Sequence, residues 1–353
     1  MKLETLFLQP VESLFYCDFY INFQKYFFNR MRDDLIYYNP DRNNLIEVYL
    51  IEKNTERFWI PSFNPPRYFV LNHYEFPNLK TVKDFKKLPA NKTSSPRTFF
   101  ISELDSYIKT SFAGRISSNQ RSLDKLAVLD ALKVSSVLSR LTECSKWPKN
   151  TAFLPEYGGV VWNGLGCIYR STKPSTVCAD VIIPLHSLCG TDINAIDDLP
   201  LFVQIANEKN MDPTRFLLDN IISQLIKSWY FFVFDIHRKI TCHGQNILVG
   251  FDSNLNNFKI IHRDLQAKTY NQPLTYEEII EISKLYDFHM GWLLFDEIKR
   301  DNPLFVDSKL ITQGIRELYR TNVGITLCDH RVYEQGVGLN KKTVILEKEP
   351  KFR

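Results

Sequence analysis

The sequence predicts an α+β fold in which mixed or antiparallel sheets are flanked by helices and the chain divides into two lobes. Aromatic and β-branched runs, broken by Pro and Asn, dominate the first 90 residues, as is typical of short strands and turns. Later stretches carry apolar residues at three- and four-residue spacing, which indicates amphipathic helices. A chain of 353 residues is also long enough to form two units rather than one.

The composition argues against several classes of protein. With 44% hydrophobic and 24% charged residues, the chain is typical of globular proteins and not of disordered, collagen-like or coiled-coil ones. A net charge of +4 is too small to indicate nucleic-acid binding by itself. The seven cysteines form no CxxC pair, which favours reduced thiols over a disulfide framework or zinc site. Because we find neither a signal peptide nor an apolar run of about 18 residues, we expect a cytoplasmic protein without a membrane partner.

The first elements in the chain are strands. TFFISEL and YIKTSFA, between residues 98 and 113, predict a strand pair, and GCIYR at 166–170 predicts another strand. Between them, Ser118 is the expected N-cap of an amphipathic helix. The apolar residues that define this helix are Leu123, Leu126, Ala127, Val134, Val137, Leu138 and Leu141.

The second half of the chain contains a long helix followed by a hairpin. Apolar spacing predicts a helix from about Pro213 to Ile240, and further helices between residues 275 and 320. ILVGF and FKIIH are apolar runs joined by the turn-rich connector DSNLNN, which predicts a β-hairpin over residues 247–262. If Phe251 pairs with Phe258, antiparallel register places Asn246 opposite Arg263 and the preceding Gln245 opposite Asp264.

Five polar residues therefore meet at the open end of this hairpin: His243, Gln245, Asn246, Arg263 and Asp264. Asn246 and Asp264 offer the oxygen ligands that Mg²⁺ prefers. A cation there could carry nucleotide phosphates, with His243 and Arg263 donating to the same oxygens. Protein kinases and small-molecule phosphotransferases place an Asn before one strand and an Asp after the next in this way. The alternative is a polar hairpin end without a ligand, although five polar groups are costly to bury unpaired.

The tetrapeptide His262–Leu265 spells HRDL, the beginning of a protein-kinase catalytic loop. A kinase needs Asn seven residues after that His, and this chain has Thr269. Asp287-Phe288 is followed by His rather than Gly. The sequence therefore argues against a protein kinase.

A second polar cluster lies upstream. Ser95, Arg97 and Thr98 are followed by Lys109 and Arg121, so that three bases recur at steps of twelve residues. Near the starts of strands or a helix, such bases suit a triphosphate or a polycarboxylate. Taken alone, the spacing favours ordinary surface charge, because bases twelve residues apart are common.

Together the two clusters resemble the NRPS-independent siderophore (NIS) synthetases, the aerobactin-synthetase-like family. The resemblance covers residues 90 to about 270. It rests on the SxRT run, on Lys109 and Arg121 in YIKTSFAGRISSNQR, on the helix at 134–139, on Arg170 in GCIYR, and on CHGQN followed by HRDLQ. Family members usually have a longer N-terminal region, so residues 1–90 are expected to be a shortened cap.

The resemblance implies a reaction, and a place for it. ATP and Mg²⁺ would activate a carboxylate of citrate or a citrate derivative as an acyl-adenylate, which an amine or hydroxyl then attacks in siderophore biosynthesis. The nucleotide would lie in a cleft between residues 91–200, a phosphate-binding lobe, and residues 201–353, a helical lobe with a kinase-like hairpin. Many members form dimers, so a homodimer is compatible with the resemblance.

The resemblance also implies roles for individual residues. Asn246 and Asp264 would bind the metal, Lys109, Arg121 and His243 would be catalytic, and Arg121 and Arg170 would bind the substrate. The residues that would hold the nucleotide are Ser95, Arg97, Thr98, Lys109, His243, Gln245, Asn246, Arg263 and Asp264. Two alternatives stay open: a small-molecule phosphotransferase of kinase-like architecture, and a degenerate relative that binds nucleotide without turnover.

Overall fold

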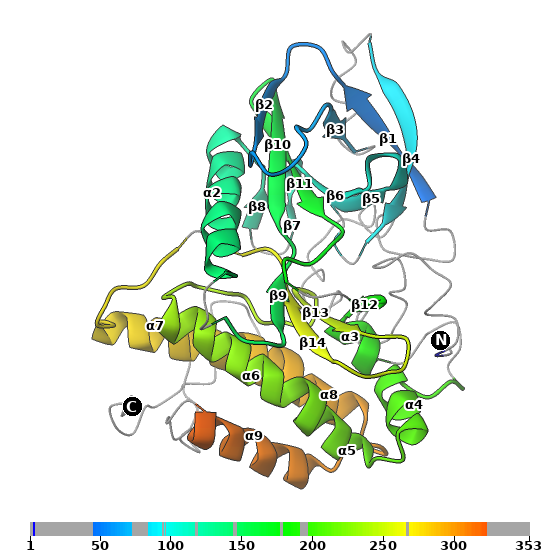
Figure 1. Ribbon diagram of the computed structural model, residues 1–353, viewed down its shortest axis with the longest axis vertical. Helices are drawn as coiled ribbons and strands as arrows, with labels where there is room; N and C mark the ends of the chain where they lie inside the picture. The colour runs from blue at the N-terminus through cyan, green and yellow to red at the C-terminus, as the bar shows by residue number, and fades with distance from the viewer. Residues whose placement is uncertain are drawn as a thin grey trace.

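The computed structural model describes residues 3, 45–72, 84–93, 95, 97–116, 119–143, 147–176, 179–190, 197–265 and 268–322. Within these residues the chain has the expected mixture of helices and sheets. Figure 1 shows an eight-stranded sheet with one long helix beside it, and below it a four-stranded sheet that rests on the remaining helices. The α+β class is confirmed, whereas the nucleotide cleft and the kinase-like division into lobes stay predictions.

The eight-stranded sheet is antiparallel at every junction. Its strands, in spatial order, are β2 (Glu56–Trp59), β10 (Glu156–Trp162), β11 (Leu165–Ser171), β6 (Ser106–Thr110), β5 (Thr98–Ile101), β4 (Lys86–Lys92), β1 (Leu45–Ile51) and β3 (Phe69–Leu71). The short η4 (Ser102–Leu104) joins β5 to β6. These two strands pair antiparallel, which confirms the predicted strand pair. A separate ribbon pairs β7 (Phe112–Ile116) with β8 (Asn119–Arg121).

The hairpin between β10 and β11 shows how the sequence sets this sheet. Asn163 and Gly164 both have positive φ, at 48° and 78°. Two such residues form the tight turn whose twist matches that of paired strands, and Asn-Gly is its preferred sequence. The core of the sheet is made of large apolar side chains, including Val48, Phe99 and Ile108, all fully buried.

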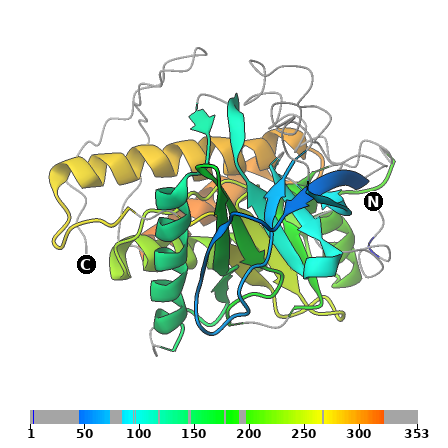
Figure 2. The same ribbon diagram turned by 90° about the horizontal axis from the view of Figure 1, so that it is seen from above.

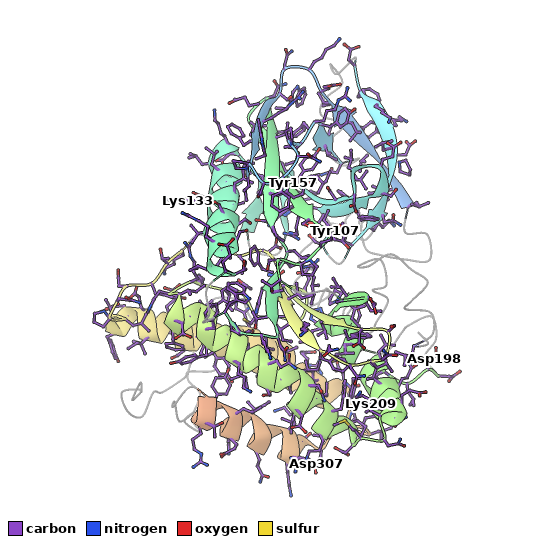
Figure 3. The ribbon with its side chains drawn as sticks, viewed as in Figure 1. Tyr107, Lys133, Tyr157, Asp198, Lys209 and Asp307 are labelled. Carbon is purple, nitrogen blue, oxygen red and sulfur yellow. The ribbon has the colours of Figure 1, made fainter. Side chains whose placement is uncertain are left out.

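One long helix, α2 (Lys125–Leu141), packs against β10 and β11. Its N-cap is Asp124, whose carboxylate accepts a hydrogen bond of 2.8 Å from the Ala127 amide. The predicted cap at Ser118 was therefore wrong, and Ser118 itself lies outside the described residues. The helix can approach closely because a Cβ at Gly159 would lie 2.3 Å from Val128 Cγ1. Lys133 lies on the outer, exposed face of the helix (Figure 3).

The four-stranded sheet contains the predicted hairpin. Its order is β12 (Val181–Pro184), β13 (Ile247–Phe251), β14 (Lys259–His262) and β9 (Thr151–Phe153), with only the β14–β9 pair parallel among these strands. Ile247 lies opposite His262, and Gly250 lies opposite Lys259. This register is the predicted one, and it continues beyond the strands because the Arg263 amide donates to the Asn246 carbonyl at 3.2 Å.

The remaining helices cover one face of the four-stranded sheet (Figures 1 and 2). They are α3 (Leu185–Cys189), α4 (Leu201–Glu208), α5 (Pro213–Phe216), α6 (Ser223–Tyr230), α7 (Tyr276–Tyr286), α8 (Glu297–Asp301) and α9 (Ser308–Asn322), with π-helical stretches η5 (Leu217–Ile222), η6 (Phe231–Asp235) and η7 (Asp287–Asp296). Elements α5 to η6 follow one another without a break, so the predicted helix from Pro213 is confirmed but ends at Asp235. Of the helices described, none combines the length and apolar character that crossing a bilayer requires.

The sheets cross the predicted domain limits at residues 90 and 200. Strand β4 runs through residue 90, and β1 and β3 belong to the same sheet as the strands that follow it. Strands β9 and β12, which precede residue 200, pair with the hairpin that follows it. The division into a cap and two lobes stays a prediction, and much of the cap lies outside the described residues.

Candidate functional site

Two basic side chains leave the same face of the eight-stranded sheet. Lys109 on β6 pairs with Ile168 on β11, and Arg170 follows Ile168 by two residues. Because side chains alternate along a strand, Lys109 and Arg170 lie on one face as near neighbours. Tyr107 on β6, directly opposite Arg170, shares this face.

Asp264 joins these two bases from the other sheet. It follows β14 and has a positive φ of 55°, a backbone conformation that Asp tolerates better than most residues. Its Oδ1 accepts a hydrogen bond of 2.8 Å from Lys109 Nζ and a second one from Arg170 Nη2. Lys109 and Asp264 are 155 residues apart in the chain. The fold therefore brings together the two polar clusters that the sequence analysis found separately.

A second carboxylate, that of Glu156, also forms an ion pair with Arg170. Arg170 Nη2 also donates to Glu156 Oε1 at 2.8 Å, and the Glu156 amide donates to Ser135 Oγ at 2.8 Å. The exposed fraction of the side chain is 1% for Arg170 and 8% for Glu156, but 15% for Lys109 and 24% for Asp264. Solvent therefore reaches this set of charges from the side of Lys109 and Asp264.

The pKa values in this set favour an ionised Asp264. Burial raises the pKa of its carboxyl, but Arg170, Lys109 and Arg263 outweigh burial and hold that pKa well below its usual range. For Lys109, burial lowers the pKa, Asp264 opposes the change, and Arg97 adds to it. The low pKa of Asp264 keeps a negative charge between the two sheets at neutral pH.

Arg263 fastens the end of the hairpin. Its guanidinium donates to the Gln245 carbonyl, from Nε at 3.0 Å and from Nη2 at 2.6 Å. The Arg263 side chain is thereby directed at the backbone that precedes β13. Asn246 is buried beside it, and the backbone N–H of Asn246 donates to the His243 carbonyl at 2.9 Å. The five polar residues of the hairpin end thus lie close together, as the register predicts.

Two further histidines surround His243. The rings of His243 and His289 lie 5.6 Å apart, with His289 placed by η7. On the other side, a Cβ at Gly244 would lie 2.3 Å from His186 Cδ2, so only glycine allows the imidazole of His186 to pack there. Burial lowers the pKa of His243 well below its usual value, that of His186 to about 3 and that of His289 to about 4. All three imidazoles are therefore neutral at pH 7.

The SxRT residues lie beside Lys109. Thr98 is directly opposite Lys109 in the sheet, and the Arg97 carbonyl accepts a hydrogen bond of 2.8 Å from the Thr110 amide. Ser95 lies in the preceding turn, where its carbonyl accepts from the Thr98 amide at 3.1 Å. Arg121 is in β8, opposite Phe112, and the structure describes its backbone but not its side chain.

Metal binding was predicted at Asn246 and Asp264. Within the described part of the chain, no group of three or more His, Cys, Asp and Glu residues is arranged to hold a metal ion. Asp264 Oδ1 accepts the hydrogen bonds from Lys109 and Arg170, and no described residue donates a hydrogen bond to Oδ2. The donor set therefore suits a hard cation that takes only one or two oxygens from the protein and the rest from phosphates and water, as Mg²⁺ does.

Sequence reasoning missed Glu156, His186 and His289. Glu156 carries no motif, and only the pairing of β10 with β11 places it against Arg170. His186 and His289 lie 57 and 46 residues from His243, without the spacing of a metal or catalytic motif. Their packing around the hairpin depends on α3 and η7, so no signal in the sequence identifies them.

Comparison with known proteins shows which families and structures this chain is similar to. Residues 78–190, which carry Ser95, Lys109 and Arg170, match the model of the IucA / IucC family. The match does not extend to the hairpin that carries Asn246 and Asp264. A search of curated proteins found no match.

Solved structures extend the likeness to most of the fold. Aerobactin synthetase IucA from a hypervirulent pathotype of Klebsiella pneumoniae shares 12% identity over 81% of this chain, with a TM-score of 0.57. Aerobactin synthetase IucC from the same source shares 12% identity over 84% of this chain, with a TM-score of 0.54. The chain spans 63% and 62% of the lengths of these two aerobactin synthetases. At such low identity these structures show a common fold.

Proposed function

We propose that the chain is an ATP-dependent ligase that condenses a polycarboxylic acid, such as citrate or a citrate derivative, with an amine or hydroxyl in siderophore biosynthesis. The observation that carries this proposal is the contact of 2.8 Å between Lys109 and Asp264. It joins the segment that matches the IucA / IucC family to a hairpin end that lies outside the match. Both halves of the expected nucleotide site therefore face one another.

The proposed reaction has two steps. The substrate carboxylate attacks the α-phosphorus of ATP, which forms an acyl-adenylate and releases pyrophosphate. The amine or hydroxyl then attacks the acyl carbon, which forms an amide or ester and releases AMP. Negative charge gathers around phosphorus in the first step, so fixed cations stabilise its transition state. Lys109 would take this role, with Arg97 close enough to act on its pKa.

The other residues would position the nucleotide. Ser95 and Thr98 border Lys109, and His243, neutral and buried, can donate one hydrogen bond to a phosphate oxygen. Arg121 is proposed to bind the substrate carboxylate. Arg170 was assigned to the substrate as well, but its Nη2 donates to Glu156 and Asp264, so in this geometry it positions Asp264.

Asp264 Oδ2 and the amide oxygen of Asn246 would hold magnesium. When bound there, the ion supplies positive charge at the phosphate oxygens. Asp264 itself is kept ionised and correctly oriented by Lys109 and Arg170. Arg263 fixes the backbone from which Asn246 projects, because it donates to the neighbouring Gln245 carbonyl.

The test is ATP–pyrophosphate exchange by the purified chain with Mg²⁺ and a panel of polycarboxylic acids, citrate first. We expect exchange that depends on one acid and falls at least about 100-fold in Lys109→Gln, the loss typical of a removed electrostatic donor. Asp264→Asn should lower it as strongly, because it removes the proposed metal ligand. Lys125→Gln is the matched control, because Lys125 also forms an ion pair, with Glu56, but on the exposed surface. Its exchange should equal that of the unchanged protein.

Other products would favour the other readings of the site. Release of ADP without pyrophosphate exchange would contradict the ligase and favour a small-molecule phosphotransferase, whose metal site uses the same Asn and Asp placement. ATP binding with no turnover for any acid would favour a degenerate relative. Unchanged exchange in Lys109→Gln would show that the contact with Asp264 does not mark the site.

A further inference from the structure

Strand β3 belongs to one edge of the eight-stranded sheet but reaches back across it. In the order of strands it is the last, next to β1, yet it also contacts β6, β10 and β11. The Val70 amide donates to Cys167 Sγ at 3.5 Å, and Tyr169 Oη donates to the Tyr68 carbonyl at 2.5 Å. The sheet is therefore curled, and the end of β3 lies beside β6 and β11.

Asn72 follows β3 and is buried there, with 1% of its surface exposed. Its Nδ2 donates to Thr110 Oγ1 at 3.0 Å and to the Ser111 carbonyl at 3.1 Å. A side-chain amide nitrogen carries two protons, so these two bonds use both. Thr110 and Ser111 lie where β6 ends and the chain leaves the sheet for β7. One buried side chain thus fixes the point between the strand that carries Lys109 and the ribbon that carries Arg121.

The two hydrogen bonds of Asn72 lead to different parts of the candidate site. On the first branch, Thr110 Oγ1 donates onward to the Arg97 carbonyl at 3.2 Å, and the Thr110 amide donates to the same oxygen at 2.8 Å. This branch ties the backbone of Arg97 to the residue that follows Lys109. It therefore holds the two bases of the proposed nucleotide site at a fixed spacing.

The second branch holds the base of the β7–β8 ribbon. The Ser111 amide donates to the Gly166 carbonyl at 3.1 Å, and Ser111 Oγ accepts from the Leu123 amide at 3.1 Å. The Leu123 carbonyl accepts in turn from the Gly166 amide at 2.7 Å. Ser111 precedes the ribbon and Leu123 follows it, so these bonds hold both of its ends against β11. They also fix the backbone of Arg121, two residues before Leu123.

We propose that Asn72 is a positioning residue that sets how the proposed nucleotide-binding and acid-binding parts of the site lie relative to each other. Because one amide group makes both bonds, Arg97 and Lys109 on the first branch move together with Arg121 on the second. Hydrogen bonds buried away from water hold their partners rigidly. Such rigidity matters because a displacement of about 1 Å can lower the rate of a reaction about 100-fold. This inference rests on the proposed function, which gives these bases their ligands.

The experiment measures the KM for ATP and the KM for the acid separately, by ATP–pyrophosphate exchange of the full chain, and ATP affinity by isothermal titration. Thr110→Val is nearly isosteric and removes the hydroxyl of the first branch. It should raise the KM for ATP about tenfold and leave that for the acid unchanged. Ser111→Ala removes the acceptor of the Leu123 amide and should do the reverse. Asn72→Asp, whose carboxylate cannot donate to the Ser111 carbonyl, should raise both KM values.

Two controls separate positioning from a loss of stability. A destabilised protein has fewer folded molecules, which lowers the maximal rate but leaves both KM values unchanged. Thr214→Val is the matched control, because Thr214 is equally buried and its hydroxyl links the Asp307 amide, at 2.9 Å, to the Phe305 carbonyl among the helices. It should lower the melting temperature and change neither KM. Thr110→Ser keeps the hydroxyl of the first branch and should restore the KM for ATP of the unchanged protein.

The outcomes also separate this inference from the proposed function. If Thr110→Val and Ser111→Ala lower the maximal rate of exchange and leave both KM values unchanged, Asn72 serves stability only and the inference alone is wrong. If the unchanged protein binds ATP without exchange, the ligase is wrong, but Thr110→Val should still weaken ATP binding about tenfold. An unchanged affinity in that case would overturn the positioning role as well. If ATP does not bind at all, both proposals are contradicted.

Discussion

His262 offers a prediction whose size follows from its surroundings. It lies at the end of β14 with 1% of its surface exposed, and burial lowers its pKa from 6.5 to about 3. Its Nε2 and Ser228 Oγ share a hydrogen bond of 2.9 Å. Because the single Ser228 hydroxyl proton is directed at the Leu225 carbonyl at 3.0 Å, the proton between Ser228 and His262 belongs to Nε2. The folded protein therefore holds His262 as a neutral Nε2–H imidazole.

The sign of the pH effect follows from this depressed pKa. Between pH 6.5 and about 3, the unfolded chain protonates His262 and the folded chain does not. The unfolded state thus binds more protons, and the free energy of unfolding falls as the pH is lowered through this range. From pH 7 to pH 5 the contribution of His262 to that free energy should fall by about 2 kcal/mol.

The assay compares urea unfolding at pH 7 and pH 5 for two variants. Ser228→Ala removes the hydrogen bond but keeps the buried imidazole, so it should retain the full pH dependence. The double variant Ser228→Ala/His262→Phe keeps a buried ring without a titratable group, so its loss of stability from pH 7 to pH 5 should be smaller by about 2 kcal/mol. Equal losses in the two variants would refute the assignment of a buried, neutral His262.

Two other predictions concern packing and capping. Gly244→Ala should lower the melting temperature and disturb the hairpin end, because the new Cβ would lie 2.3 Å from the His186 ring. Combination with His186→Ala should restore much of the lost melting temperature. Strictly additive effects in the double variant would contradict this explanation. Asp124→Ala should lower the free energy of unfolding by about 1 kcal/mol, because the Ala127 amide loses its acceptor. Asp130→Ala, on an exposed turn of the same helix, is its control, and an equal loss in both variants would argue against a cap at Asp124.

The hairpin register could be predicted because two constraints act together. The six-residue connector fixes how far the strands are offset, and a slip of one residue would move Ile260 from the apolar cluster on one face of the sheet to the cluster on the other. The same two constraints also set the pairing of Asn246 with Arg263, which lie just beyond the ends of the two strands. Long apolar patterns likewise located the helix that starts at Pro213.

Helix starts and irregular strands were harder to predict. Ser118 and Asp124 are both good capping residues, and the apolar spacing near Leu123 does not choose between them. The turn at Gly164 alone would place Tyr157 opposite Arg170. A β-bulge near Gly158 shifts the pairing by one residue, so that Glu156 takes that place. The ion pair that holds Arg170 thus depends on a local irregularity that the alternating pattern does not reveal.

The buried charges also bear on whether this junction has a function. An ion pair such as Arg170–Glu156 loses most of its favourable Coulomb energy to desolvation, and apolar residues of similar volume would stabilise the fold at least as well. Lys109 and Asp264 add two more charges at the same junction, where each sheet already has an apolar core of its own. Stability alone therefore does not explain them, and a cluster of buried charges of this kind favours a functional site. Asp264 lies outside the segment that matches the family, so the carboxylate that contacts Lys109 at this junction is supplied by the hairpin.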